Sequence, residues 1–264
     1  MRDRRYRRAA VSEPASYTQQ DQPPGVPPLS LTGERTLPDV PEENYWYRRH
    51  LAVYRWVAER CRGVDVVDMA CGEGYGTAVL AERAARVTGV DANPEAYEHA
   101  RTKYTRPGVR FVRDLVEGYS EPCDAVVFLQ TIEHLEDPKA VLDHFRSILR
   151  PGGAAYVSTP NLLTLAPPGA EKSDNPWHVR EFRAEEFREL CEASFERVEL
   201  LGLFHARKLR AHELAISHGW DDLHPKLGIT KRFYDWFTPA ISEHDFALRP
   251  APLDGALDFV AVLR

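Results

Sequence analysis

The sequence predicts an α/β fold built on a doubly wound, mostly parallel β-sheet with helices on both faces. Strand-like apolar runs alternate with helical segments of about 10 to 12 residues between residues 64 and 160. A glycine-rich turn follows the first run, and acidic or polar residues follow several of the others. Because ligands of such sheets bind beyond the carboxyl ends of the strands, the same observations predict where a site lies.

Length and charge restrict the class of protein. At 264 residues, one domain with extensions is expected. The formal net charge is −6, with 34 basic and 40 acidic residues, which argues against a dedicated nucleic-acid binder. The four cysteines are scattered without a C-x-x-C pair, and no apolar run approaches the roughly 18 residues of a membrane span. The basic N-terminus lacks the apolar segment of a signal peptide, so we expect a cytoplasmic protein.

Residues 1–28 are rich in arginine and proline. We expect them to form a disordered tail, because few of them could pack in a core. Alternatively, the arginines could contact an anionic partner. Ordered structure is expected from Leu29, so that a single domain covers residues 29–264.

A helix is expected ahead of the first strand, over about residues 42–57. Four apolar residues recur there at helical spacing: Tyr47, Leu51, Tyr54 and Val57. This helix can simply pack on the sheet. Alternatively, it closes over a bound ligand, with Arg48, Arg49 or His50 binding a carboxylate.

The alternating elements follow in order. Strands are expected at residues 65–69, 86–91, 109–113, 124–129 and 154–158, and helices at 75–85, 94–104 and 138–149. The run 124–129 is continuously apolar after its first residue, as a central parallel strand should be. The segment Arg150-Pro151-Gly152-Gly153 is typical of a turn before the fifth strand.

The first strand leads into a loop with glycines at positions 72, 74 and 76. Glycine is needed where the backbone turns sharply or passes close to a ligand. Gly72 and Gly74 fit the dinucleotide pattern G-x-G-x-x-G, but Thr77 stands at its third glycine. Asp68, four residues before Gly72, lies outside that pattern and suits a ligand with a cationic amino-acid part. A tight turn without a ligand is the alternative.

Two further acids end strands. Asp91 lies 19 residues after Gly72, the separation expected of a carboxylate that binds ribose hydroxyls. Alternatively, it caps the helix that begins at Pro94. Asp114 follows the third strand and can accept a hydrogen bond from an adenine amino group, with Leu115 lining the ring. A solvated loop acid is the other interpretation.

The fourth strand runs into Gln130-Thr131-Ile132-Glu133-His134. Seven candidate residues therefore lie at the predicted carboxyl edge of the sheet: Asp68, Gly72, Asp91, Asp114, Gln130, Glu133 and His134. This coincidence is stronger evidence for a nucleotide-like ligand than any single motif.

These segments, with Leu149 to Gly153, resemble successive motifs of the class I S-adenosylmethionine-dependent methyltransferases over roughly residues 64–160. The resemblance implies a Rossmann-like sheet of seven strands, with the last two near residues 196–201 and 257–263, the final one antiparallel. It implies S-adenosylmethionine as the cofactor and S-adenosylhomocysteine as its product. The residues that it implies for cofactor binding are Asp68, Ala70, Gly72, Gly74, Tyr75, Asp91, Ala92, Asp114, Leu115, Gln130 and Arg49.

A narrower resemblance lies outside this core. Residues 31–36, 43–50 and 202–205 look like actinobacterial methyltransferases linked to methylglucose lipopolysaccharide synthesis. That family implies O-methylation of a saccharide such as an α-glucan. The alternatives are O-methylation of a small aromatic, quinone or natural-product acceptor, and a catalytically silent cofactor-binding module.

A sugar hydroxyl is a weak nucleophile and needs a base or a Lewis acid. His134 and Glu133 are the catalytic candidates, since imidazole titrates in the useful range. Alternatively, the two residues only brace the loop.

A divalent metal ion is the other possibility, with Gln130, Glu133, His134 and the distant His178 as ligands. This set resembles the E-x-x-E-H site of small-RNA 2′-O-methyltransferases, but Gln130 replaces the first glutamate and removes an anionic ligand. A mixed oxygen and nitrogen set suits zinc or cobalt better than magnesium.

Residues 160–183 and 203–250 exceed ordinary connections in length, so we expect them to form a helical or loop lid over the acceptor. Several aromatic residues in them could stack on a sugar or pack in the core: Trp177, Trp220, Phe233, Tyr234, Trp236 and Phe237. The acceptor's identity and the oligomeric state stay open.

Overall fold

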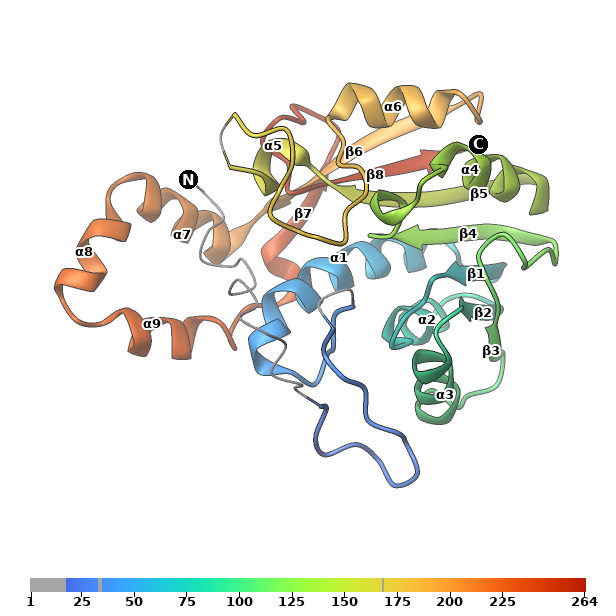
Figure 1. Cartoon of the computed structure of the whole chain (residues 1–264), viewed down its shortest axis with the longest axis horizontal. Coiled ribbons are helices and arrows are strands. Elements are labelled where there is room, and N and C mark those ends of the chain that lie inside the picture. Colours follow the sequence, from blue (N-terminus) through green and yellow to red (C-terminus); the bar gives the residue numbers. More distant parts are fainter. Residues whose placement is uncertain (1–17, 33–34, 168) are drawn as a thin grey trace.

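The described residues of the computed structural model are 18–32, 35–167 and 169–264, and they form one sheet of eight strands (Figure 1). The strand order is β3-β2-β1-β4-β5-β8-β6-β7. The strands are β1 Asp65–Met69, β2 Arg86–Asp91, β3 Val109–Arg113, β4 Cys123–Leu129, β5 Leu149–Pro160, β6 Val198–His205, β7 Phe246–Arg249 and β8 Asp258–Leu263. The predicted doubly wound, mostly parallel fold is confirmed.

Strands β1 to β5 run parallel, and β8 lies antiparallel between β5 and β6. The predicted antiparallel insertion of the last strand is therefore correct. The predicted number of seven strands is wrong, because β7 adds an eighth, antiparallel strand at the edge beside β6. It is only four residues long and lies in the segment for which we expected a lid.

Helices cover both faces of the sheet, with α1 and α2 on one side and α4 and α6 on the other (Figure 1). The helices are α1 Asn44–Arg60, α2 Tyr75–Leu80, α3 Pro94–Lys103, α4 Pro138–Ile148, α5 Leu162–Leu165, α6 Ala184–Glu192, α7 Arg207–Ser217, α8 Trp220–Lys226 and α9 Thr230–Phe237. Adjacent residues of β1 face opposite layers: Val66 packs with α1, and Val67 packs with α4. Both faces of the central strands are therefore buried, as their continuous apolar sequence predicts. No helix among the described residues is long and apolar enough to cross a membrane.

Several element ends differ from the predictions. Helix α2 stops at Leu80, and turns replace its expected last residues. Strand β5 begins at Leu149 and includes the expected turn 150–153, since Leu149 pairs with Cys123 before a register shift. Gly152 has a φ of 84°, which explains why the irregularity falls there.

The prediction of a disordered tail over residues 1–28 is wrong for residues 18–28. Residues 1–17 lie outside the described residues, whereas residues 18–28 have a defined path. Gln19 N donates to Leu29 O at 2.9 Å, and Gln19 and Val26 are buried. Leu29, Leu37 and Val40 form a small apolar cluster of their own. Residues 18–28 are thus ordered although they are rich in proline and polar residues, because the segment packs on the domain and does not have to form a core of its own.

The long connection after β6 forms an arm, defined as residues 207–237, which holds α7, α8 and α9 and extends away from the sheet (Figure 1). Strand β6 is antiparallel to β8, and β8 is antiparallel to β5. The arm therefore leaves the sheet at the carboxyl edge of the parallel strands. The chain returns beside α1, where Asn44 Nδ2 donates to Thr238 O at 2.8 Å.

Candidate functional site

The glycine loop joins β1 to α2 at the carboxyl edge of the sheet. Gly72 and Gly74 have φ values of 56° and 97°, a region that disfavours side chains. A Cβ atom on Gly74 would lie 2.8 Å from the Cβ of Ala100, whereas nothing lies within 4 Å of such an atom on Gly72. The loop therefore packs against α3 on one side and leaves space at Gly72, which fits a ligand held against its backbone.

Asp68 lies beneath this loop and is fully buried. Thr77 Oγ1 donates to its carboxylate at 2.6 Å, and the Tyr54 hydroxyl donates at 3.2 Å. Burial raises the pKa of Asp68 to about 7, against the effect of these two hydrogen bonds. Asp68 thus braces the start of α2.

Asp91 ends β2 and reaches across to the glycine loop. Its carboxylate accepts hydrogen bonds from Gly72 N at 2.7 Å and Asn93 N at 2.9 Å. The side chain of Asn93, not that of Asp91, caps α3, since it accepts from the amides of Glu95 and Ala96. The helix-cap alternative for Asp91 is therefore wrong. Ala92 is exposed beside it.

Asp114 and Leu115 follow β3 at the same edge. Asp114 is half-buried, and its carboxylate accepts from Leu115 N at 2.8 Å. The Leu115 side chain is 63% exposed, which is unusual for leucine and leaves it available to a ligand. Their contact with an adenine ring stays a prediction.

Ala70 and Gln130 directly follow the neighbouring strands β1 and β4, and both have a φ of 54°. Non-glycine residues rarely adopt this conformation, and where they do it is often at functional sites. The backbone N–H of Gln130 donates to Ser158 O at 3.1 Å, and its side-chain amide donates to Ser158 Oγ at 3.0 Å. Both predicted residues therefore lie at the centre of the edge in fixed positions.

Helix α1 covers the glycine loop, but two of its three predicted cations are held elsewhere. Arg49 is buried and binds Asp258 through both carboxylate oxygens, at 2.6 and 2.7 Å. Arg48 lies 3.0 Å from Glu243. The charge of Arg49 is matched by Asp258, at the start of β8, and its contact with the methionine carboxylate stays a prediction.

The N-terminal end of α2 contacts α1 through aromatic rings. The Tyr75 ring packs edge-on against Tyr47 and Tyr54, with centroids 5.1 and 5.6 Å away. The Tyr75 hydroxyl lies 3.4 Å from Nδ1 of His50. His50 is thus the predicted cation of α1 that contacts the glycine-loop side.

Glu133 and His134 form one turn of 3₁₀-helix at Ile132–His134, after β4. Glu133 is buried, and burial raises its pKa to about 8, although Thr159 Oγ1 donates to it at 3.2 Å. His134 Nδ1 donates to Trp177 O at 2.8 Å. This bond places the lone pair of the neutral imidazole on Nε2.

The loop of residues 173–182 closes over this turn. Val179 N and Arg180 N donate to Glu133 O at 2.9 and 3.1 Å. His178 is buried, with Nδ1 2.7 Å from a Glu181 oxygen and Nε2 2.8 Å from the Asn175 amide. One potential ligand atom from each of Glu133, His134 and His178 lies within 4.8 Å of the others. Three of the four predicted metal ligands therefore come together from segments more than 40 residues apart in the sequence, without Gln130.

Sequence reasoning missed Glu73, between the two ligand-side glycines. It is buried and accepts hydrogen bonds from Tyr75 N at 3.1 Å and from the Tyr104 hydroxyl at 2.7 Å. It also lies within 3.0 Å of His99 and 2.7 Å of Lys103. The available signal was an acidic residue in an otherwise small and aromatic loop.

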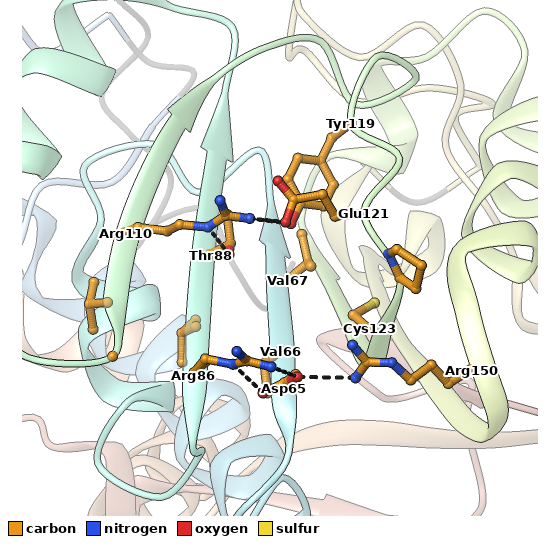
Figure 2. A pocket seen from close by; sticks show the side chains of 14 residues that line it. Asp65, Val66, Val67, Arg86, Thr88, Arg110, Tyr119, Glu121, Cys123 and Arg150 are labelled. Atoms are coloured by element: carbon orange, nitrogen blue, oxygen red, sulfur yellow. Dashed lines mark hydrogen bonds and ion pairs between the residues drawn. The ribbon is translucent and has the colours of Figure 1, made fainter.

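A cavity of about 400 Å³ lies at the opposite edge of the sheet, over the amino ends of β1, β2 and β3 (Figure 2). Its arginines are matched by carboxylates. Arg86 and Arg150 both bind Asp65, at 2.5 and 3.1 Å, and Arg110 binds Glu121. Since the predicted residues all lie at the carboxyl edge, this cavity is not the candidate site.

Comparison with known proteins agrees with this geometry. A family model described as a methyltransferase domain matches residues 36–214. The chain is 40% identical over 246 residues to a protein of Mycolicibacterium smegmatis named "Probable S-adenosylmethionine-dependent methyltransferase", covering 89% of this chain and 94% of the relative. It is 34% identical over 119 residues to a ubiquinone biosynthesis O-methyltransferase of Xylella fastidiosa, covering 41% of this chain and 48% of that protein.

A solved structure shares the fold. The crystal structure of a SAM-dependent methyltransferase from Thermotoga maritima superposes with a TM-score of 0.54 at 18% identity, covering 84% of this chain and 94% of that chain. The family match over residues 36–214 and the 40% identity to the Mycolicibacterium smegmatis relative assign the chain: it belongs to the S-adenosylmethionine-dependent methyltransferases.

Proposed function

We propose that the chain transfers the methyl group of S-adenosylmethionine to a hydroxyl group of a saccharide, with His134 as the general base. The observation that carries this proposal is the 2.8 Å hydrogen bond from His134 Nδ1 to Trp177 O. It fixes the ring and directs the basic Nε2 lone pair, as a general base requires. Glu133 lies buried beside it and supports the turn through Thr159.

The residues at the edge fit the cofactor. Gly72 leaves open space against its backbone, and the fixed strand ends at Ala70 and Gln130 flank it. Asp91 is proposed to bind the ribose, and Asp114 with Leu115 the adenine. When bound, S-adenosylmethionine supplies an activated methyl group, so the chain has to position the acceptor oxygen and remove its proton.

A saccharide acceptor is supported by the loop that holds His134. Trp177 is 48% exposed, and the same loop carries the polar residues Ser173, Asp174 and Asn175 as well as the apolar Pro176 and Val179. An aromatic face beside hydrogen-bonding groups suits a sugar, which has both apolar C–H faces and hydroxyls. A small aromatic or quinone acceptor is the alternative, since the Xylella relative is named for ubiquinone biosynthesis, but that match covers less than half of this chain.

A second candidate mechanism uses a divalent metal ion, and the convergence of Glu133, His134 and His178 favours it. Both imidazoles donate Nδ1–H to an oxygen, the arrangement that orients metal-bound histidines. The donor set of two nitrogens and one oxygen suits zinc or cobalt. A metal ion would have to replace the Asn175 amide at His178 Nε2. We leave Gln130 out of this ligand set, because its amide donates to Ser158.

Replacement of His134 by Ala tests the mechanism. Loss of a general base costs about 100-fold or more in turnover, so kcat should fall by at least that factor while cofactor affinity stays near the wild-type value. The assay follows labelled methyl transfer to glucans and to small phenols in parallel. Turnover near the wild-type rate would reject both the base and the metal role.

Dialysis of the wild-type protein against a chelator separates the two mechanisms. Undiminished activity identifies His134 as a base, whereas loss that zinc or cobalt restores identifies a metal ligand. Methyl transfer to phenols but not to glucans would reject the saccharide acceptor in favour of the aromatic one. Failure to bind S-adenosylhomocysteine would reject the proposed cofactor residues.

A further inference from the structure

The N-terminal segment lies across α3, and two side chains of α3 connect it to the glycine loop. We call residues 18–32 and 35–40 the strap. Within it, Thr18 forms an antiparallel bridge with Ser30. Leu29 N also donates to the side chain of Gln19, at 3.2 Å. The strap therefore has hydrogen bonds of its own in addition to those that it makes with α3.

His99 of α3 connects the strap to the loop. Its Nδ1 donates to the strap carbonyl of Pro27 at 2.7 Å, and its Nε2 lies 3.0 Å from Glu73 Oε1. The His99 side chain has no exposed surface. A polar side chain buried so completely with oxygen atoms at both ring nitrogens holds both partners in position.

A second connection runs in parallel. Lys103 Nζ lies 2.6 Å from Asp39 of the strap and 2.7 Å from the same oxygen of Glu73. Asp39 in turn accepts hydrogen bonds from Gln19 and Gln22, at 3.4 and 3.2 Å. Both connections therefore end at one carboxylate, between Gly72 and Gly74.

Glu73 passes this restraint to the backbone of the loop. Its second oxygen accepts from Tyr75 N, at the first residue of α2. A shift of the Glu73 carboxylate would therefore displace the turn whose backbone leaves space at Gly72. A displacement of about 1 Å is large for a binding site that relies on fixed geometry.

We propose that the strap is part of the cofactor site, and that Glu73 and His99 are positioning residues that couple strap docking to binding of S-adenosylmethionine. The inference rests on the proposed assignment of the glycine loop to the cofactor, and it is independent of the acceptor. Because coupling between two binding events is reciprocal, the cofactor should also stabilise the docked strap.

Two variants of His99 break the connection at different ends. His99→Asn keeps a donor near the position of Nδ1 for Pro27 and loses Glu73, whereas His99→Gln reaches toward Glu73 and loses Pro27. The dissociation constant for S-adenosylhomocysteine, measured by calorimetry without acceptor, should rise about tenfold in both variants. If Glu73 needs only local support, His99→Gln should bind normally, and that result would overturn the coupling.

Two further variants complete the test. Asp39 is half-exposed on the strap, where a substitution should be tolerated. Asp39→Ala should weaken binding of S-adenosylhomocysteine a few-fold. His144→Gln is the matched control, since His144 of α4 binds a backbone carbonyl at 2.8 Å on the other face of the sheet, and its affinity should be unchanged. Normal affinity in Asp39→Ala would overturn the second connection, through Lys103, whereas normal affinity in His99→Gln would overturn the coupling itself.

Hydrogen exchange gives a readout that a merely structural role would not change. S-adenosylhomocysteine should slow exchange of the amides of Gln19 and Leu29 in the wild-type chain by a measurable factor, and not in His99→Asn. Equal exchange with and without the ligand in the wild-type chain would reject the proposal. A wild-type chain that does not bind the ligand at all would instead reject the proposed cofactor site.

Discussion

Gly76 shows how closely the glycine loop is fitted to α1. A Cβ atom at this position would overlap the ring of Tyr54, whose hydroxyl donates to Asp68. Thr77, the next residue, donates to the other oxygen of the same carboxylate. Gly76 is therefore required by the packing of a neighbour, whereas Gly72 and Gly74 are required by their backbone conformation.

Replacement of Gly76 by Ala should lower the free energy of unfolding by about 1–3 kcal/mol, because overpacking forces the Tyr54 ring to move. Urea unfolding of the free protein measures the change. Gly255→Ala is the matched control, since nothing lies within 4 Å of a Cβ atom there. Adding Tyr54→Leu to Gly76→Ala should remove much of the penalty, and simple additivity of the two changes would contradict this explanation.

At the scale of single residues, the sequence identifies those whose role depends on their own position in a motif. Asp68, Gly72, Asp91 and the Glu133–His134 pair were all predicted, and all lie at one edge of the sheet. The ion pair of Arg49 with Asp258 was not predicted, because the two residues are 209 positions apart and only the insertion of β8 brings them together. Burial of an ionic partner at such separation leaves no local pattern.

At the scale of elements, the loop 173–182 covers the strand end at which we propose that the acceptor binds. Its hydrogen bonds with Glu133 and His134 hold it against the turn Ile132–His134. Trp177 N is itself fixed by Asn175 Oδ1 at 3.0 Å. The Trp177 side chain is thus exposed although its backbone is tied down, which is an arrangement expected of a binding surface.

Replacement of Trp177 by Ala should raise the KM for a saccharide acceptor about tenfold, the cost of one lost aromatic contact, with a smaller change in kcat. The hydrogen bond to His134 comes from the backbone and survives the substitution. Trp177→Phe should recover much of the affinity. Trp236→Ala, at an exposed tryptophan of the arm, is the control. Equal effects of Trp177→Ala on KM and kcat would mean that the loop had moved and that Trp177 does not contact the acceptor.

Most aromatic residues that were candidates for stacking on the acceptor serve the arm itself. Phe233 of α9 packs against Trp220, Tyr234 and Phe237, with ring centroids 5.0 to 5.2 Å away. The sequence could not separate these residues from Trp177, because aromatic side chains suit both a core and a ligand surface. Only their position relative to other elements decides between the two.

At the scale of the whole molecule, the sheet was predictable because each parallel strand is an apolar run with a helix on either side. The edge strand β7 was less predictable than the parallel strands. It is short, only half-buried for most of its length, and pairs with a strand more than 40 residues earlier in the sequence. The strap was missed for a related reason. Its residues are polar or proline, and their order depends on Glu73, His99 and Lys103.

The distribution of acidic groups gives the whole molecule an unusual response to pH. Partly buried acids with arginine partners, such as Asp65, whose pKa is lowered to about 2 by the hydrogen bond from Arg86, contribute stability that is lost only as pH falls below about 4. Asp68 and Glu133 act in the opposite direction, because burial raises their pKa values to about 7 and about 8. Folding therefore takes up protons at these two residues.

The sign of the effect follows from proton linkage. The unfolded carboxyls titrate near pH 4, so between about pH 4 and their folded pKa values the folded chain binds more protons, and stability falls as pH rises. Each group contributes roughly 1.4 kcal/mol for each pH unit within its window.

Urea unfolding of the cofactor-free chain should show the free energy of unfolding falling by several kcal/mol between pH 5 and pH 7.5, relative to the isosteric double variant Asp68→Asn, Glu133→Gln. Each single variant should remove its own part of the slope, that of Asp68 ending near pH 7 and that of Glu133 near pH 8. Parallel profiles for the wild-type chain and the double variant would mean that water reaches both carboxylates and that the two acids are charged in the folded protein throughout this range.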